Sequence, residues 1–200
     1  MSKILVAVLC LVFSTTVSAK TIIVLGDSIS ASYGIEVGEG WVSLLQKKLQ
    51  AEKFPYRVFN ESISGDTSAG GLARIDSALA RHKPAIVLLE LGANDGLRGL
   101  SPKQMKANLT EIIQRSRKVG ARVLLLGMKL PPNYGKRFVD MFYDVYPQLA
   151  DELGVSYVPF LLEDVALDKE LMQRDGLHPN AKAQPDIAEK VWGYLLPLLK

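Results

Sequence analysis

The chain has 200 residues, of which 48% are apolar, and its 24 basic and 21 acidic side chains give a net charge of +3 at pH 7. This length is sufficient for one substantial hydrophobic core and too short for two ordinary domains, so we expect a single domain. The nearly balanced charge, with lysines and arginines scattered singly or in pairs, argues against nucleic acid or another polyanion as a partner.

The first 19 residues differ in composition from the rest of the chain. One basic residue, Lys3, precedes an apolar run from Ile4 to Phe13, and small or modest side chains follow as far as Ala19. This order is typical of a secretory signal peptide, and the apolar run is shorter than the ~20 residues that span a bilayer. We therefore expect a signal peptide at 1–19, a domain at 20–200 without a transmembrane segment, and a periplasmic or secreted location. An uncleaved anchor is the alternative.

Removal of the signal peptide would also remove Cys10, which is the only cysteine of the chain. The mature protein would then contain no disulfide and no thiolate metal ligand. Such a composition suits an oxidising compartment without requiring one.

From Lys20 onward, short apolar runs alternate with longer segments of helical periodicity. This alternation is the signature of βαβ units around a parallel sheet. With right-handed crossovers, five strands favour a three-layer α/β/α, flavodoxin-like fold with strand order 2-1-3-4-5. The five predicted strands are Thr21–Leu25, Arg57–Ile63, Ala85–Leu91, Arg122–Leu126 and Val155–Val158.

Apolar residues at helical spacing predict five helices among these strands. The third is the best defined, because Ser101 is a typical N-cap, Pro102 suits the first helical position and Gly120 suits a helix end. A fourth helix is expected from Phe138 to Leu149, with a kink or break at Pro147, whose ring removes a backbone donor. The core-facing residues of the other three are Trp41, Leu44, Leu45 and Leu49, then Leu72, Ile75 and Leu79, and finally Ile187, Val191 and Leu195.

Polar residues follow the first three predicted strands, whose carboxyl ends would meet over one crevice. Ser28 follows the first strand, Gly65 the second and Asn94 the third. Ser28 is a candidate nucleophile, and the amides of Ser28 and Gly65 with the Asn94 side chain are donors that suit an oxyanion. Each residue alone is better explained by a turn or a helix cap. Their coincidence at neighbouring strand ends favours acyl transfer.

A serine nucleophile needs a base, and histidine is the usual base near neutral pH. His82 is predicted at the amino edge of the sheet, where a helix-terminus contact explains it. His178 lies beyond the fifth strand, three residues after Asp175, which is suited to orient its imidazole. The 20 residues from Val158 to His178 are long enough to cross the ~14 Å back to the first strand. With the two histidines on opposite sides of the sheet, we expect no metal site and no cofactor.

Four segments of the chain, in this order, resemble the sequence blocks of the SGNH, or GDSL-type, hydrolases. They are Gly26–Ser30, Gly65, Gly92–Asp95 and Asp175–Pro179. Ile29 stands where the motif that names the family has Leu, which is a conservative aliphatic change.

The resemblance implies a function as well as a fold. It implies hydrolysis of carboxylic esters and acyl thioesters, of the arylesterase, acyl-CoA thioesterase or lysophospholipase type, through an acyl-enzyme on Ser28. Asp175 and His178 would complete the catalytic triad. The oxyanion hole would consist of the Ser28 amide, the Gly65 amide and the Asn94 side chain.

An apolar wall beside the crevice favours an acyl chain over a sugar as the bound group. The expected partners are small acyl esters or thioesters, lysophospholipids among them, and the enzyme is expected to be a monomer. Two alternatives remain: a carbohydrate O-deacetylase of the same family, and a non-catalytic flavodoxin-like module that binds phosphate at the glycine-rich turn 65–71, which lacks a lysine. The residues expected in the wall are Leu97, Leu100, Leu130, Pro131 and Tyr134.

Three acidic residues lie close to the candidate site in sequence. Glu90, inside the third predicted strand, is expected to be a paired structural carboxylate, because buried charges are paired, and a support for the site is the alternative. Asp27 and Asp95 are expected to accept hydrogen bonds from local amides.

Overall fold

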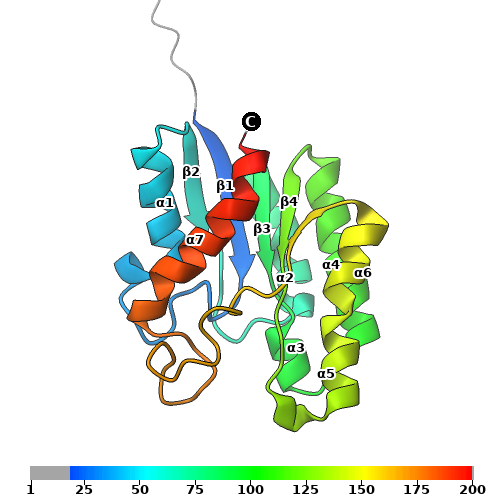
Figure 1. Ribbon diagram of the computed structural model, residues 1–200. Coiled ribbons are helices and arrows are strands. Elements are labelled where there is room, and N and C mark those ends of the chain that lie inside the picture. The colour runs from blue at the N-terminus through cyan, green and yellow to red at the C-terminus, as the bar shows by residue number, and fades with distance from the viewer. Residues whose placement is uncertain (1–18, 200) are drawn as a thin grey trace, which may run out of the picture.

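A computed structural model of the protein describes residues 19–199, so the predicted signal peptide lies outside the described residues except for Ala19. Five parallel strands form one sheet in the order β2-β1-β3-β4-β5 (Figure 1). The predicted α/β fold and strand order are therefore confirmed. The strands are β1 (Lys20–Gly26), β2 (Tyr56–Asn60), β3 (Ile86–Glu90), β4 (Arg122–Leu126) and β5 (Ser156–Val158).

The second strand is shorter than predicted, since β2 ends at Asn60 and not at Ile63. The chain nevertheless continues beside β1, because the amides of Glu61 and Ile63 donate to the carbonyls of Val24 and Gly26 at 2.9 and 3.0 Å. The apolar pattern thus predicted the path of this segment, although its last residues form no regular strand.

Helices cover both faces of the sheet (Figure 1). On one face α1 packs against α7, and on the other α2, α4 and α6 lie side by side. The central strands β1 and β3 are buried between these layers, as their continuous apolar runs require. The helices are α1 (Trp41–Ala51), α2 (Ser68–His82), α4 (Pro102–Lys118), α6 (Val145–Leu153) and α7 (Gln184–Leu195).

The capping signals of α4 act as predicted. The Ser101 hydroxyl accepts a hydrogen bond from the Gln104 amide, and Pro102 occupies the first helical position. The helix ends at Lys118, and Gly120 follows with a φ of 86°. A left-handed glycine of this kind turns the chain toward β4.

The predicted fourth helix is in fact two helices, α5 (Lys136–Tyr143) and α6, which meet at Asp144. The prediction of a break at Pro147 was therefore wrong by three residues. Pro147 is the third residue of α6, where a backbone amide has no partner within the helix. Its ring excludes a helical carbonyl four residues earlier, at Tyr143, so α5 ends there and α6 begins anew.

Short helical segments complete the described residues. One of them, α3 (Ala93–Leu97), follows β3 and was not predicted. The 3-10 turns are η1 (Val37–Glu39), η2 (Pro132–Tyr134), η3 (Ala181–Ala183) and η4 (Leu196–Leu198). Across residues 19–199, none of the helices combines the length and the apolar character needed to cross a membrane.

The parallel strands bring their carboxyl ends to one edge of the sheet, which is the lower edge in Figure 1. The segments after β1, β2 and β3 are therefore neighbours there. The long segment between β5 and α7 also returns to this edge (Figure 1). All five predicted catalytic and oxyanion residues belong to these four segments.

Candidate active site

Ser28 lies in a tight turn that directly follows β1. The turn is closed by hydrogen bonds from the Ala31 amide to the Asp27 carbonyl and from the Tyr33 amide to the Ser28 carbonyl, at 2.9 and 3.1 Å. Within residues 19–199, the Ser28 amide itself donates to no other group. This donor therefore stays available to a ligand.

His178 connects Ser28 with Asp175. Ser28 Oγ lies 2.8 Å from His178 Nε2, and Asp175 Oδ2 lies 2.7 Å from His178 Nδ1. Because the carboxylate can only accept, the ring proton belongs on Nδ1, which leaves Nε2 to accept the Ser28 hydroxyl proton. The structure thus brings together the three residues that the sequence predicted as a triad.

Asp175 is held in its charged form. Its Oδ1 accepts hydrogen bonds from the amides of Leu177 and His178, at 2.9 and 3.0 Å. Burial acts to raise the pKa of Asp175, but the hydrogen bonds from the His178 ring and from the two amides outweigh it and lower the pKa to about 2. The carboxylate is therefore ionised throughout the pH range in which a histidine base works.

The loop that carries His178 is fixed by backbone pairing. Gln173 and His178 are joined by a bond from the Gln173 amide to the His178 carbonyl at 2.8 Å, and Met172 forms an antiparallel bridge with Pro179. The Gln173 side chain also donates to the Tyr33 carbonyl at 2.7 Å, and the Tyr33 ring lies 4.6 Å from the imidazole. Sequence analysis gave Tyr33 and Gln173 no role, because a contact between residues 140 positions apart has no local signal.

Gly65 is required at its position by its backbone conformation. Its φ of 80° lies in the left-handed region that favours glycine. Space is not the reason for a glycine here, because a Cβ would meet only Arg98 Nη2, at 3.6 Å. Among residues 19–199 the Gly65 amide, like that of Ser28, has no acceptor. Arg98 donates to the Gly65 carbonyl at 2.7 Å and so holds the turn.

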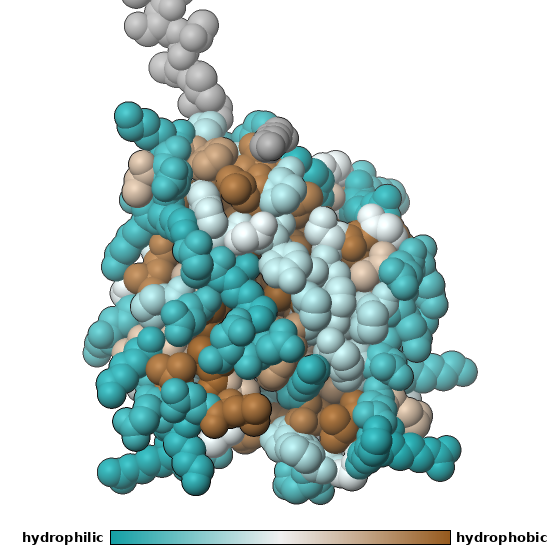
Figure 2. Space-filling view, viewed as in Figure 1, coloured by the Kyte–Doolittle hydropathy of each residue, from teal (hydrophilic) through white to brown (hydrophobic). Residues whose placement is uncertain are grey.

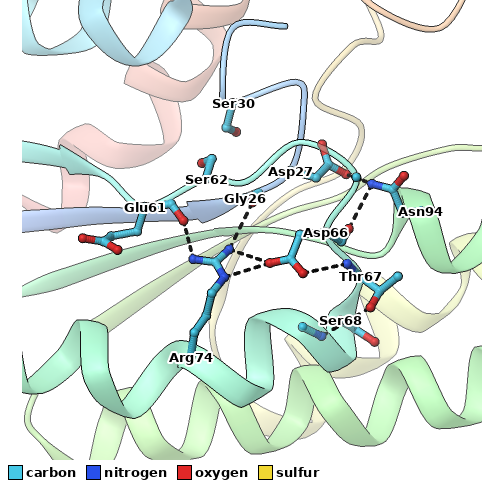
Figure 3. A network of polar contacts seen from close by, with 12 residues as sticks. Gly26, Asp27, Ser30, Glu61, Ser62, Asp66, Thr67, Ser68, Arg74 and Asn94 are labelled. Atoms are coloured by element: carbon cyan, nitrogen blue, oxygen red, sulfur yellow. Dashed lines mark hydrogen bonds and ion pairs between the residues drawn. The ribbon is translucent and has the colours of Figure 1, made fainter.

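Asn94 lies in α3, beside the residue that precedes Ser28. Its Nδ2 donates to Asp27 Oδ2 at 3.1 Å and to the Asp66 carbonyl at 2.9 Å (Figure 3). Gly92, with a φ of 118°, turns the chain from β3 into α3. Asn94 is therefore tied to the segments after β1 and β2, which carry Ser28 and Gly65.

Two buried carboxyl groups support the Ser28 turn. Glu90 is fully buried, and its Oε2 accepts from the Ser30 hydroxyl at 2.7 Å and from the Asp27 amide at 3.2 Å. Burial, with the negative charge of Asp27 as a second cause, raises the pKa of Glu90 well above its usual range. Burial likewise raises the pKa of Asp27 to about 6, against the lowering effect of the hydrogen bond from the Ile29 amide. Glu90 is thus a hydrogen-bonded structural carboxylate, as expected, and the groups that it holds belong to the Ser28 turn.

The expectation of local amide partners holds for one aspartate and fails for the other. Asp27 Oδ1 accepts from the Ile29 amide at 3.0 Å. Asp95 instead reaches the start of α2, where it accepts from the Ser68 amide at 2.7 Å and from the Ser68 hydroxyl at 2.5 Å. A carboxylate stabilises a helix N-terminus, and this contact links the segments that follow β2 and β3, the two strands on either side of β1.

The same contacts argue against a phosphate site at the turn before α2. The Thr67 amide donates to Asp66 Oδ1 at 3.1 Å, the Ser68 amide to Asp95, and the Gly70 amide to the Thr67 hydroxyl at 3.3 Å. A phosphate at a helix N-terminus needs such amides for itself. Here the protein's own oxygens use them, and two carboxylates would repel an anion.

His82 has partners of its own. It is the last residue of α2, its Nε2 lies 2.5 Å from Glu61 Oε1, and its ring lies 4.4 Å from that of Phe59. The predicted structural role therefore fits, although the partner is a carboxylate after β2 and not the helix terminus.

A cavity of about 510 Å³ opens beside Ser28, Asn94 and His178. Of the five residues predicted for its wall, Leu97, Leu130 and Pro131 line it. The other two, Leu100 and Tyr134, lie outside this lining and are 45% and 38% exposed. Tyr134 instead donates its hydroxyl proton to the Leu97 carbonyl at 3.2 Å. A larger groove, of about 900 Å³ between α2 and α4, contains none of the predicted site residues.

The opposite wall of the cavity comes from the segment between β5 and His178, and sequence analysis missed it. Its signal was the apolar run that begins at Phe160, within a stretch that was interpreted only as a long connection. Figure 2 shows hydrophobic residues grouped at the lower end of the molecule, where the strands of Figure 1 end. The residues of this wall are Phe160, Leu162, Ala166, Leu167, Met172 and Leu177, and Met128 after β4 adds to them.

Residues 24–184 match the model of the GDSL-like Lipase/Acylhydrolase family, a span that includes the whole hydrogen-bonded triad. The chain belongs to this family. It is 53% identical to Esterase TesA of Pseudomonas aeruginosa over 182 residues, which are 91% of this chain and 90% of the relative. It is 45% identical to Thioesterase 1/protease 1/lysophospholipase L1 of Escherichia coli K12 over 182 residues, 91% of this chain and 86% of the relative.

A solved structure agrees with this assignment. The crystal structure of TesA matches with a TM-score of 0.88 at 53% identity, and the match covers 90% of this chain and 99% of that chain. Among residues 19–199, no group of three or more His, Cys, Asp or Glu side chains is arranged to hold a metal ion.

Proposed function

We propose that this protein is a serine hydrolase that cleaves carboxylic esters and acyl thioesters through an acyl-enzyme on Ser28. The observation that carries the proposal is the continuous hydrogen-bonded chain from Ser28 through His178 to Asp175, with separations of 2.8 and 2.7 Å. The relatives named as an esterase and as a thioesterase and lysophospholipase support the same reaction class.

In the acylation step, Ser28 Oγ attacks the carbonyl carbon while His178 Nε2 takes the hydroxyl proton. The carbonyl π electrons move to oxygen and give a tetrahedral oxyanion. Collapse of this intermediate re-forms the carbonyl and expels the alkoxide or thiolate, which receives the proton from His178. Asp175 stabilises the imidazolium that exists between these two proton transfers.

Deacylation repeats the sequence with water as the nucleophile. His178 takes a proton from the water as its oxygen attacks the acyl carbon, and the proton then returns to Ser28 Oγ as the bond to the serine breaks. The products are a carboxylic acid and the free enzyme. The acid loses its proton to solvent.

The oxyanion needs fixed donors that do not have to reorganise. The amides of Ser28 and Gly65 meet this requirement, because neither has an acceptor within residues 19–199. Asn94 is the third proposed donor, and its side chain is anchored to the same two segments.

The apolar cavity favours acyl chains longer than acetyl. Leucine side chains line both of its walls, methionine and phenylalanine side chains add to one of them, and each methylene buried there adds about 0.8 kcal/mol. Fatty acyl esters and thioesters, lysophospholipids among them, suit such a cavity better than the acetyl groups of a carbohydrate. The predicted signal peptide supports a periplasmic or secreted location.

The decisive experiment combines Ser28→Ala with a fluorophosphonate probe, which labels activated serines. Wild-type protein is expected to hydrolyse a p-nitrophenyl ester and to take up the probe, and Ser28→Ala to lose both. Ser64→Ala is the matched control, because this exposed serine lies on the same edge of the sheet. Undiminished hydrolysis or labelling in Ser28→Ala would show that the proposed mechanism is wrong.

A further inference from the structure

We propose that Asp27 is a positioning residue, which holds the side-chain amide of Asn94 in the orientation that the oxyanion needs. The proposal rests on the proposed function, because it takes Asn94 to be an oxyanion donor. Asp27 itself is only 1% exposed and belongs to neither the triad nor the donors. The hydrolytic steps above give this buried carboxylate no task.

The contact between the two side chains is direct. Asn94 Nδ2 donates to Asp27 Oδ2 at 3.1 Å, and the two groups point toward each other in Figure 3. The other oxygen, Oδ1, accepts from the amide of Ile29 at 3.0 Å. One carboxylate therefore joins the turn that carries Ser28 to the proposed donor from α3.

A second acceptor fixes the same amide from the side of β2. Asn94 Nδ2 also donates to the Asp66 carbonyl at 2.9 Å. Asp66 is held by Arg74, whose Nε donates to Asp66 Oδ2 at 2.8 Å and whose guanidinium also bonds the carbonyls of Gly26 and Glu61 (Figure 3). The two acceptors of Asn94 thus belong to segments that are themselves tied together.

These two acceptors determine which end of the amide faces each group. An asparagine side chain has two terminal orientations, which exchange its oxygen and its nitrogen. In the reversed orientation, its oxygen would face both the Asp27 carboxylate and the Asp66 carbonyl, so acceptors would oppose acceptors. Asp27 therefore selects the orientation that presents hydrogens, and a reversed amide would repel an oxyanion.

The contacts also indicate which hydrogen serves the oxyanion. Both hydrogens of Asn94 Nδ2 have acceptors, so one of these bonds must be shared or exchanged when the oxyanion forms. An ionised carboxylate is a stronger acceptor than a backbone carbonyl. The bond to Asp27 therefore persists as the anchor and keeps the amide plane fixed, and the hydrogen that faces the Asp66 carbonyl is shared between that carbonyl and the oxyanion.

The test is a double-mutant cycle on kcat and KM for a p-nitrophenyl ester, with Asp27→Asn, Asn94→Ala and the two combined. Asn94→Ala is expected to reduce kcat by ~10²- to 10³-fold. Asp27→Asn keeps the size of the side chain and an acceptor for Ile29 but turns an NH₂ group toward Asn94, and we expect it to reduce kcat by ~10- to 100-fold with KM nearly unchanged. The combined variant should be no slower than Asn94→Ala, because nothing remains to be positioned.

Ser30→Ala is the matched control, because Ser30 lies in the same buried turn and bonds Glu90 but does not contact Asn94. Its effect on kcat should multiply with that of Asn94→Ala. Multiplication of the Asp27→Asn and Asn94→Ala effects would overturn the proposal, as would a loss of less than 3-fold in Asp27→Asn. Full activity in Ser28→Ala or in Asn94→Ala would instead refute the proposed function, so the two failures are distinguishable.

A measurement on the wild-type protein covers the case in which Asp27→Asn does not fold. The side-chain amide signals of Asn94, identified by their loss in Asn94→Ala, should exchange hydrogen with water at least 10-fold more slowly than those of Asn133. Asn133 is the reference because its side chain is exposed. Exchange at equal rates would show that the two acceptors do not hold Asn94, and the proposal would fall.

Discussion

Replacement of Asp175 by asparagine removes the group that selects the reactive form of the base. Asparagine has the same shape but presents one oxygen and one NH₂ group. If the NH₂ group faces His178 Nδ1, that nitrogen must be the acceptor, and Nε2 then carries the hydrogen and cannot take the Ser28 proton. If the oxygen faces His178, the NH₂ group opposes the amides of Leu177 and His178, which now donate to Asp175 Oδ1. Both orientations are unfavourable.

The expected cost follows from these contacts. The lost hydrogen bond from His178 to the charged carboxylate contributed about 1.5 to 3 kcal/mol. Breaking the new bond from the asparagine NH₂ group to His178 Nδ1, so that the reactive tautomer can form, costs about 1 kcal/mol more. Because the Asp175 side chain is 39% exposed, solvent screens part of this energy. We therefore expect kcat for a p-nitrophenyl ester to fall by ~10²- to 10³-fold in Asp175→Asn.

The assay compares kcat and thermal midpoints for wild type, Asp175→Asn and Asp168→Asn. Asp168 is a suitable control, because it is an exposed residue of the same long segment, and within residues 19–199 its carboxylate accepts only from the Glu170 amide, at 2.8 Å. The control should retain its kcat. A folded Asp175→Asn protein with kcat within 10-fold of wild type would refute the assignment of Asp175 as the orienting carboxylate.

Two further predictions concern stability and selectivity. Because burial raises the pKa of Glu90, the folded protein keeps a proton that the unfolded chain releases above about pH 4.5. The free energy of unfolding therefore falls by up to ~1.4 kcal/mol per pH unit as the pH rises toward the pKa of Glu90 in the folded state. Glu90→Gln keeps an acceptor for Ser30, and its urea midpoint should therefore fall less between pH 5 and pH 8 than that of wild type; equal declines would contradict this. For p-nitrophenyl esters, kcat/KM should rise by up to ~4-fold for each methylene beyond acetyl until the cavity is filled. Equal rates for acetyl and hexanoyl esters would contradict this and favour a deacetylase. Faster removal of acetyl groups from xylan would do the same.

The strands and the triad were predictable because their signals are local or follow from topology. Continuous apolar runs identify the buried strands β1 and β3, and the order of parallel strands brings their carboxyl ends together. Ser28, Asp175 and His178 then need only a connection of sufficient length to meet. The sequence supplies that length without showing its path.

The features that were missed depend on tertiary contacts. The residues of α3 include glycine and aspartate, which are poor helix formers, and this short helix depends on the turn at Gly92 and on the contact of Asp95 with Ser68. The break at Asp144 arises because the ring of Pro147 excludes a helical carbonyl at Tyr143, four residues before the proline. No residue at the break itself signals it. The second cavity wall has no periodicity that distinguishes it from an ordinary loop.

The segment from Pro159 to His178 carries both the base and one wall of the acyl cavity. Exchange of this segment with that of another family member would therefore change the acyl chain-length selectivity and the position of the His178 base together. Acyl chain-length selectivity alone is better adjusted on the opposite wall, by substitution of Leu97 or Leu130. Within residues 19–199, no hydrogen bond connects either leucine to the His178 loop. The fold thus separates a wall that is independent of the base from one that carries the base.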